Sequence, residues 1–134
     1  MTYYLDTDIV IFMLVRGDKR LINRVKKLSP KEIKIPSMVR SELITGAYRC
    51  RDPEANMNLL MEFISPYETV PFDESASTIC GKIRAELSMK GEEIGPNGLV
   101  IAATALSRGG ILVTNNTREF SRVKGLQIED WSKQ

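Results

Sequence analysis

The chain has 134 residues, of which 43% are hydrophobic and 27% charged, and its formal net charge is +2. This composition supports one domain, residues 1–134, and excludes a disordered chain or a small disulfide-stapled protein. The absence of histidine excludes Ser-His-Asp and Cys-His catalysis and HExxH zinc sites, so hydrolysis has to rely on carboxylates, hydroxyls or lysine. The apolar runs fall short of the roughly 20 residues of a membrane span, and no signal peptide is evident, so we expect a cytoplasmic protein. Cys50 and Cys80 have no CxxC partner and are expected to be buried free thiols.

The first half of the chain alternates between strand-like and helix-like patterns. These patterns predict strands over residues 3–5 and 33–36 and helices over residues 9–15, 21–28 and 37–48. Thr7 or Asp8 is placed to cap the first helix, and Ser37 follows Pro36 as a candidate cap for the third. The second helix is amphipathic, and we expect its cationic face to meet solvent.

The second half continues the alternation. The patterns predict helices over residues 58–64, 75–89 and 99–106 and strands over residues 68–71 and 111–113. Asp52-Pro53 reads as a break before the first of these helices, while Gly95-Pro96 opens the last one and Gly109-Gly110 ends it. Alternating strands and helices indicate an α/β layered domain with a mainly parallel central sheet flanked by helices.

Polar residues follow the predicted strands at the positions where a parallel sheet binds ligands. Asp6 ends the first strand, Glu42 lies on the helix after the second, and Asn115, Asn116 and Glu119 follow the strand over 111–113. Ligands of open α/β sheets lie beyond the carboxyl ends of the strands, so these groups can converge at one edge. Converging carboxylates raise one another's pKa unless a divalent cation compensates them, and hard oxygen ligands favour Mg²⁺ or Mn²⁺.

Each of these residues also has an ordinary structural interpretation. Asp6 or Asp8 alone is about as suitable for a helix cap as for a ligand. Glu42 and Glu119 alone fit solvated helix positions, and the two asparagines fit turns. Spacing by itself therefore leaves both interpretations open.

Several motifs occur together in one order along the chain. The sequence closely resembles the enteric-type VapC toxins, essentially from end to end. The motifs that carry this resemblance are Leu5-Asp6-Thr7, Ser41-Glu42-Leu43-x-x-Gly46, Gly81-Lys82-Ile83-Arg84-Ala85-Glu86-Leu87, Ile94-Gly95-Pro96, Val113-Thr114-Asn115-Asn116, Asn116-Thr117-Arg118-Glu119-Phe120 and Glu129-Asp130-Trp131. Each is weak alone, but together and in register over one domain they are specific.

The resemblance implies a three-layer PIN domain and a toxin of a type II toxin-antitoxin system. Such a protein is an endoribonuclease that cuts RNA with Mg²⁺ or Mn²⁺, and for the enteric-type members the substrate is initiator tRNA, cleaved in the anticodon stem-loop. It implies a VapB-type antitoxin as partner, operator DNA bound through the antitoxin, a homodimer and no membrane association.

The resemblance also implies roles for individual residues. By motif position Asp6 resembles the first metal carboxylate, Glu42 the second, and Glu119 the downstream acid. Asn116 resembles a polar neighbour of that acid, and Thr7 a hydroxyl beside the metal.

This chain departs from the family pattern at two positions. The family usually has asparagine after the Asp-Thr pair, whereas here Asp8 follows and can cap the helix or add a charge near the site. After Gly-Pro the family has one residue and then aspartate, whereas here Asn97 is followed by Gly98. The third metal carboxylate is thus missing, and we predict a catalytically impaired member of a ribonuclease family.

Two other functions were weighed against this prediction. A receiver domain of two-component signalling also gathers early acids around Mg²⁺, but this chain offers no convincing phosphorylatable aspartate after a third strand and no lysine after a fifth. A non-catalytic PIN protein that binds antitoxin and acts only in complex formation and operon regulation is the stronger alternative.

Two surfaces are predicted to bind partners. The cationic segment from Arg16 to Lys27, with Arg20 and Arg24, is expected to hold RNA phosphates, although a solvated helix face fits the same pattern. The apolar helix that carries Leu60 and Phe63 is expected to line an antitoxin groove, and its alternative is core packing.

Overall fold

A parallel sheet of five strands organises the computed structural model, which describes residues 1–133. The strands are β1 (Tyr3–Leu5), β2 (Ile33–Pro36), β3 (Glu68–Val70), β4 (Ile111–Val113) and β5 (Gln127–Glu129), in the spatial order β3-β2-β1-β4-β5. The chain builds outward from β1 on one side to β2 and β3, and then returns to place β4 on the other side of β1. The carboxyl ends of β1 and β4 therefore form the topological switch point, where open α/β sheets bind ligands.

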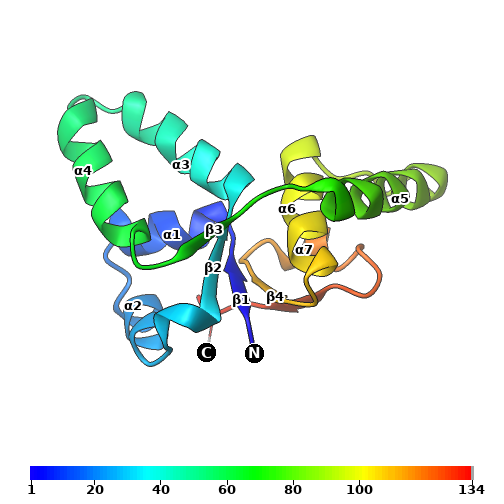
Figure 1. Ribbon diagram of the computed structural model, residues 1–134, viewed down its shortest axis with the longest axis horizontal. Helices are drawn as coiled ribbons and strands as arrows, with labels where there is room; N and C mark the ends of the chain where they lie inside the picture. Colours follow the sequence, from blue (N-terminus) through cyan, green and yellow to red (C-terminus); the bar gives the residue numbers. More distant parts are fainter. Residues whose placement is uncertain (134) are drawn as a thin grey trace.

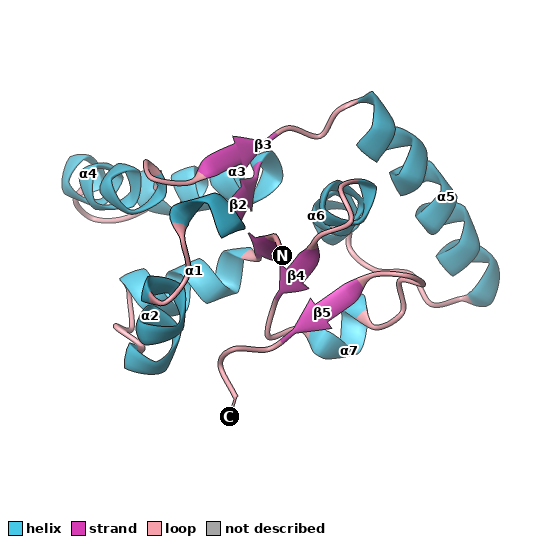
Figure 2. Cartoon of the chain, turned by 60° about the horizontal axis from the view of Figure 1, so that its bottom comes forward, coloured by secondary structure: helices cyan, strands magenta, loops and turns pink. Residues whose placement is uncertain are grey.

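Helices cover both faces of the sheet, as the parallel connections require. Figure 1 and Figure 2 show α1 and α2 on one side of the sheet and α5 and α6 on the other. The helices are α1 (Thr7–Leu14), α2 (Lys19–Lys26), α3 (Ser37–Tyr48), α4 (Pro53–Ile64), α5 (Glu74–Lys90), α6 (Pro96–Ser107) and α7 (Thr117–Phe120), and a short 3-10 helix spans Pro30–Glu32. The predicted α/β class with a parallel central sheet is confirmed.

The core lies between the sheet and its helices. Leu5 of β1 pairs in register with Val113 of β4, and both side chains are fully buried. Ile33 and Ile35 of β2 are buried as well. Since β-branched and leucine side chains on a doubly covered sheet lose nearly all contact with water, these short strands are fixed mainly by apolar burial.

Most element boundaries agree with the predicted ones, with four exceptions. Helix α4 begins at Pro53 instead of residue 58, because Asp52 accepts a hydrogen bond from Ala55 N at 3.2 Å and caps a helix with proline at its first position. The 3-10 helix, α7 and β5 were not predicted: the helices are short, and β5 carries one apolar residue, Ile128, between two polar ones.

The structure decides between the alternatives for two helix caps. For α1 the capping interpretation of Asp6 is confirmed and Thr7 and Asp8 are wrong, since the Asp6 carboxylate accepts from Thr7 N at 2.9 Å. Ser37 is the first residue of α3 instead of its cap, and its hydroxyl oxygen accepts a hydrogen bond from Phe72 N at 3.3 Å.

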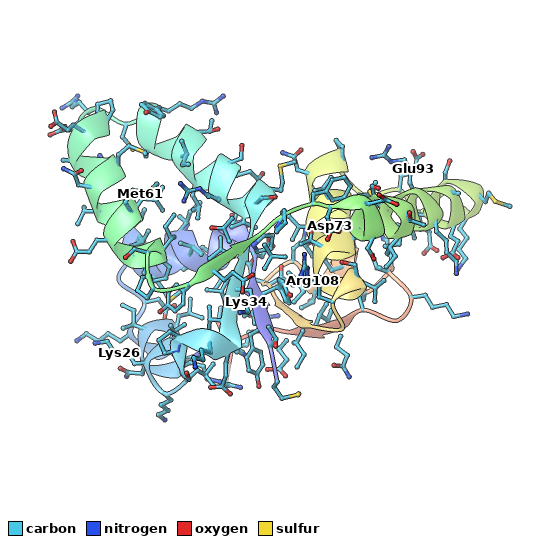
Figure 3. The ribbon with its side chains drawn as sticks, in the orientation of Figure 1. Lys26, Lys34, Met61, Asp73, Glu93 and Arg108 are labelled. Atoms are coloured by element: carbon cyan, nitrogen blue, oxygen red, sulfur yellow. The ribbon has the colours of Figure 1, made fainter. Side chains whose placement is uncertain are left out.

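The connection into α5 is held by a charged pair between Arg108 and Asp73. Arg108 Nη2 lies 3.1 Å from Asp73 Oδ2, and the other Asp73 oxygen accepts from Ala76 N to cap α5 (Figure 3). The pair links the end of α6 to the start of α5. These two helices pack against each other, and this packing positions the amino end of α6.

Two remaining sequence expectations concern cysteine and the membrane. Cys80 is buried as predicted, but Cys50 is exposed at the end of α3, where its thiol contacts Gly46 O at 3.3 Å. Within residues 1–133, no helix combines the length and apolar character needed to cross a membrane.

Candidate active site

Asp6 lies at the centre of the switch point, one residue beyond β1. Because Leu5 pairs with Val113, the next residue of each strand, Asp6 and Thr114, come to lie side by side. The Thr114 hydroxyl donates to Asp6 Oδ2 at 2.7 Å, and Thr7 N donates to Asp6 Oδ1 at 2.9 Å. Asp6 is only 8% exposed, so these two bonds fix its carboxylate in one orientation.

The pKa of the Asp6 carboxyl is raised above its ordinary value. The largest cause is burial, which disfavours the charged form, and the negative charges of Asp8 and Glu42 add to it. The hydrogen bonds from Thr114 and Thr7 act in the opposite direction but do not cancel the effect of burial. When the buried Asp6 carboxyl is ionised, its negative charge is poorly solvated and attracts a cation.

Glu42 reaches the same cavity from the second turn of α3. The Thr7 hydroxyl donates to Glu42 Oε1 at 2.7 Å, and Asn97 Nδ2 donates to Glu42 Oε2 at 3.4 Å. Glu42 thereby connects the start of α1 with the start of α6.

Glu119 enters the cavity from α7. Asn116 Nδ2 donates to Glu119 Oε2 at 3.0 Å, and the backbone N–H of Gly95 donates to Glu119 Oε1 at 3.3 Å. These hydrogen bonds favour the ionised form, and they lower the pKa of Glu119 below its ordinary value.

The acidic residues surround one small open cavity of about 210 Å³ at the carboxyl ends of β1 and β4. Nearly all residues assigned to the site from sequence are found in its wall. The lining consists of Asp6, Thr7, Asp8, Glu42, Gly98, Ile101, Asn116, Glu119 and Phe120. Asp8 is exposed in the first turn of α1, so it adds negative charge to the rim instead of capping the helix.

Position 98 leaves part of this cavity without a side chain. Gly98 lies in the first turn of α6, and a Cβ atom built there would meet only Phe120 ring carbons, at 3.6 and 3.7 Å. These distances are ordinary van der Waals contacts, so there is room for a Cβ atom at this position.

The residues present do not complete a site for a divalent cation. Their chemistry is suitable, because carboxylate oxygens are the ligands that Mg²⁺ and Mn²⁺ prefer. Across residues 1–133, however, no three acidic, histidine or cysteine side chains lie close enough together to hold a metal ion. Glu42 and Glu119 are instead each bound to neighbouring N–H and O–H donors.

Two residues of the site were missed from the sequence. Thr114 is fully buried and orients Asp6, and Asn97 contacts Glu42. The available signal for Thr114 was its position directly after an apolar strand, equivalent to that of Asp6 after β1. Thr114 and Asn97 act through these acids and do not line the cavity themselves, and Asn115 does not line it either.

The cationic segment lies away from the acidic cavity. Figure 1 shows α2 toward the end of the sheet at which β1 begins, whereas the cavity lies where β1 ends. Arg24 contacts Glu129 at 3.6 Å and lies over the Trp131 ring at 4.9 Å, while Arg20 Nη1 donates to Ser132 O at 3.4 Å. Both arginines are exposed, but each also fastens the C-terminal segment to α2.

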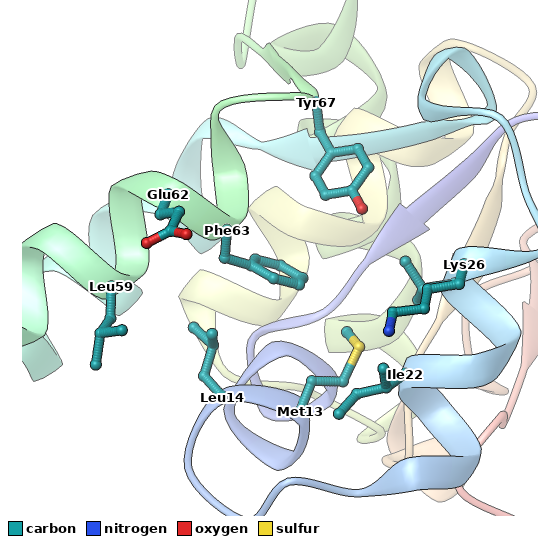
Figure 4. A pocket seen from close by; sticks show the side chains of 9 residues that line it. Met13, Leu14, Ile22, Lys26, Leu59, Glu62, Phe63 and Tyr67 are labelled. Atoms are coloured by element: carbon teal, nitrogen blue, oxygen red, sulfur yellow. The ribbon is translucent and has the colours of Figure 1, made fainter.

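An apolar groove of about 440 Å³ lies between α1, α2 and α4. Phe63 of α4 points into it toward Met13 and Leu14 of α1 (Figure 4). Leu60, which was assigned to the same surface from sequence, is 4% exposed and packs in the core. Leu59 is 60% exposed and lines the groove.

Comparison with known proteins shows the family. The PIN domain model matches residues 3–126. The tRNA(fMet)-specific endonuclease VapC of Shigella flexneri is 42% identical over 132 residues, which cover 98% of this chain and 99% of that protein. Ribonuclease VapC2 of Haemophilus influenzae is 37% identical over 131 residues, covering 98% of each chain.

Solved structures agree with this relationship over the whole fold. VapBC from Salmonella typhimurium, solved bound to DNA, superposes with a TM-score of 0.93 at 39% identity and covers 98% of both chains. VapBC2 from Rickettsia felis, bound to a DNA fragment from its promoter, has a TM-score of 0.93 at 34% identity, covering 98% of this chain and 99% of that one. The chain therefore belongs to the PIN-domain family and, within it, to the VapC ribonucleases.

Proposed function

We propose that this chain is the toxin of a type II toxin-antitoxin pair whose family activity, endonucleolytic cleavage of initiator tRNA in the anticodon stem-loop, is impaired here by Gly98. The substrate follows from the names of the relatives, since a protein 42% identical over nearly the whole chain is a tRNA(fMet)-specific endonuclease. RNA and antitoxin meet such a toxin in the cytoplasm, where we propose that it acts.

One observation carries the proposal: Asp6, Glu42 and Glu119 face one cavity at the switch point, and Gly98 lines the same cavity. Asp6 is oriented by Thr114, and Glu42 by Thr7, so two acids are preorganised by bonds from neighbouring elements. Gly98 contributes no side-chain oxygen, which leaves the acidic set short of one ligand.

The impairment follows from the geometry that such chemistry needs. A divalent cation, Mg²⁺ or Mn²⁺ in this family, is held by several carboxylates at fixed positions. In this chain Glu42 accepts hydrogen bonds from Thr7 and Asn97, and Glu119 accepts them from Asn116 and the backbone of Gly95. Misplacing a reactive group by about 1 Å already slows an enzyme by about 10²-fold, so loss of one ligand is expected to have at least that effect.

The partner proposed for the chain is a VapB-type antitoxin, with operator DNA bound through it. Relatives at 34% and 39% identity were solved as VapBC complexes with DNA. The groove between α1, α2 and α4 offers an apolar surface for an amphipathic segment of such a partner. Toxins of this family usually form homodimers, and we propose the same here.

The incomplete acidic set also favours a second function. A PIN protein without nuclease activity keeps the groove, and it would act only by binding antitoxin and regulating its operon. The two functions differ in one outcome, which is whether any RNA is cut by the chain as it stands.

The test is cleavage of purified initiator tRNA with Mg²⁺ or Mn²⁺ by the parent chain, by Gly98→Asp and by Gly98→Asn. The asparagine variant has nearly the same volume as aspartate but no charge, so it controls for filling the space beside Phe120. We expect cleavage in the anticodon stem-loop by Gly98→Asp, at least about 10²-fold faster than by the parent or by Gly98→Asn.

Two results would separate the alternatives. Equal cleavage by the parent and by Gly98→Asp would contradict the proposed impairment. No cleavage by any of the three, with antitoxin binding intact, would favour the binding-only function.

A further inference from the structure

Asn97 is the only asparagine of the sequence that precedes a glycine, and its Nδ2 lies 3.4 Å from Glu42 Oε2 beside the acidic site. The chain has asparagine at positions 23, 56, 58, 97, 115 and 116. An Asn-Gly pair is the sequence most prone to cyclise, because glycine has no side chain to hinder the attack of its backbone nitrogen on the preceding carboxamide. This chemistry needs no enzyme and no cofactor.

We propose that Asn97-Gly98 is a self-modification site, at which the chain converts the Asn97 carboxamide into a carboxylate beside Glu42. The resulting acid would lie one residue from the position where the family has its third aspartate. The chemical step does not depend on the proposed ribonuclease function, whereas its effect on metal binding rests on it.

The step proceeds through a cyclic imide. The Gly98 backbone nitrogen attacks Asn97 Cγ, forms a new C–N bond and loses its proton, while the bond from Cγ to Nδ2 breaks and ammonia leaves. One water molecule then opens the ring. Opening at Cγ gives aspartate, and opening at the main-chain carbonyl gives isoaspartate, so that NH₂ is replaced by OH overall.

Both reacting groups lie at the amino end of α6, where Gly98 is half-buried. Asn97 is exposed, and the Gly98 N–H meets no hydrogen-bond acceptor among residues 1–133, as expected for the first turn of a helix. The preceding Gly95 is the helix N-cap and supplies no side-chain cap, so this turn begins with the single bond from Leu99 N to Gly95 O at 3.0 Å.

The helical backbone at Asn97 slows the step without blocking it. Ring closure needs the Gly98 nitrogen to approach Asn97 Cγ, and this requires the first turn to open. An uncapped first turn that contains glycine opens readily, because a missing cap is worth about 1 kcal/mol and glycine costs up to about 1 kcal/mol relative to alanine. Conversion in the folded chain is therefore expected to be slower than in the unfolded chain.

The product would lie beside Glu42, one residue from the position at which the acidic set is short. Asn97 Nδ2 lies 3.4 Å from Glu42 Oε2, so the converted side chain would bring a second carboxylate against the first. Two adjacent carboxylates repel each other unless a cation compensates them. The modification would thus replace a hydrogen bond that satisfies Glu42 by a pair of oxygens that attracts a divalent ion.

The first arm of the test follows the chemical step by peptide mass spectrometry. The purified chain is incubated in mildly alkaline buffer, and conversion at each asparagine is read from the mass change of NH₂ to OH. We expect conversion at Asn97 before the other five asparagines. Gly98→Ala is the matched control: its Cβ meets only Phe120 carbons at 3.6 and 3.7 Å, so it is expected to fold while hindering ring closure.

A denatured sample of the parent chain separates sequence from structure. If Asn97 converts in the denatured chain but stays intact in the folded chain over the same period, the folded helix blocks the step and the proposal is overturned. Equal conversion in Gly98→Ala would overturn it as well, because the Asn-Gly pair would not be the cause.

The second arm measures Mn²⁺ binding by titration calorimetry in Asn97→Asp, with Asn97→Ser as a neutral control. We expect Asn97→Asp to bind Mn²⁺ at least about tenfold more tightly than the parent or the serine variant. Unchanged affinity would overturn the role of the new carboxylate as a ligand. Failure of this arm leaves cleavage by Gly98→Asp unaffected, so it is distinguishable from failure of the proposed function.

Discussion

The ionised carboxylate of Asp6 is expected to destabilise the folded protein, because it is buried. Replacing it by asparagine removes the charge but keeps a side chain that caps helices equally well, so α1 retains its cap. The carboxamide oxygen of the substituted side chain can also accept one of the two hydrogen bonds that Thr114 and Thr7 now donate. We therefore predict that Asp6→Asn is more stable than the parent at neutral pH.

The magnitude follows from the buried position of the carboxylate. Burial raises the pKa of Asp6 in the folded protein, and each unit of such a difference destabilises the folded state by about 1.4 kcal/mol once the carboxyl is ionised. Two effects act against this gain: the negative charge at the amino end of α1 is worth about 0.3 to 1 kcal/mol, and one of the two hydrogen bonds to Asp6 is lost. We expect the effect of burial to dominate and the gain to fall within the range that single stabilising substitutions commonly give, about 0.5 to 2 kcal/mol, which is a rise of a few degrees in Tm.

The sign of the pH dependence is specific. Because the folded pKa is above the unfolded one, the stability linked to the Asp6 proton is fully present below the unfolded pKa and is lost as pH rises through the folded pKa. The advantage of Asp6→Asn should thus be smallest in acid and grow toward neutral pH. Urea unfolding monitored by Trp131 fluorescence, in chelator-treated buffer at a series of pH values, measures the difference.

Asp8→Asn is the matched control, since it removes an exposed carboxylate from the same end of α1. It should change stability much less than Asp6→Asn. If Asp6→Asn proves no more stable than the parent at neutral pH, or if the difference does not shrink in acid, burial is not what governs this carboxyl.

Three further outcomes are expected. Glu119→Gln should destabilise the chain at neutral pH and have no such effect in acid. Hydrogen-bond donors lower the pKa of Glu119 in the folded protein, so the stability that its carboxylate contributes is lost as pH falls through that folded pKa. Urea unfolding at a series of pH values measures this trend, and its absence would mean that those hydrogen bonds are unimportant. Reversing Arg20 and Arg24 to glutamate should weaken RNA binding and reduce the slope of log affinity against log salt by about two, provided that circular dichroism shows an intact fold; an unchanged slope would identify α2 as a solvated face. Leu59→Asp should weaken antitoxin binding by about tenfold or more in calorimetry, whereas Met89→Asp, an exposed apolar position outside the groove, should not; equal effects would exclude the groove as the binding surface.

The parts of the fold that were predictable are those whose residues repeat with a clear period. The buried strand Ile111–Val113 and the helix after Gly95-Pro96 are so apolar that the local sequence is enough to predict them. Strand β5 was missed because Gln127 and Glu129 give it no apolar face, and it exists only because it pairs with β4. Tertiary pairing here overrides weak local preference.

The site shows the same division. Asp6, Glu42 and Glu119 were found from their positions after predicted strands and from the motifs that they share with VapC proteins. Thr114 was not found, because its role depends on the β1–β4 register, which no local pattern specifies. Asn97 was not predicted as a site residue either, since its contact with Glu42 joins residues 55 positions apart.

Equilibrium binding of Mn²⁺ is the measurement that decides whether Gly98 leaves this site one ligand short. Titration calorimetry on the parent and on Gly98→Asp, each measured with and without the additional substitution Glu42→Gln, isolates the contribution of the added carboxylate. We predict weak binding by the parent, binding at least about 10-fold tighter by Gly98→Asp, and loss of that gain when Glu42 is neutralised. Equally tight binding by the parent and Gly98→Asp would contradict this, because it would mean that Asp6, Glu42 and Glu119 hold the ion without a carboxylate at position 98.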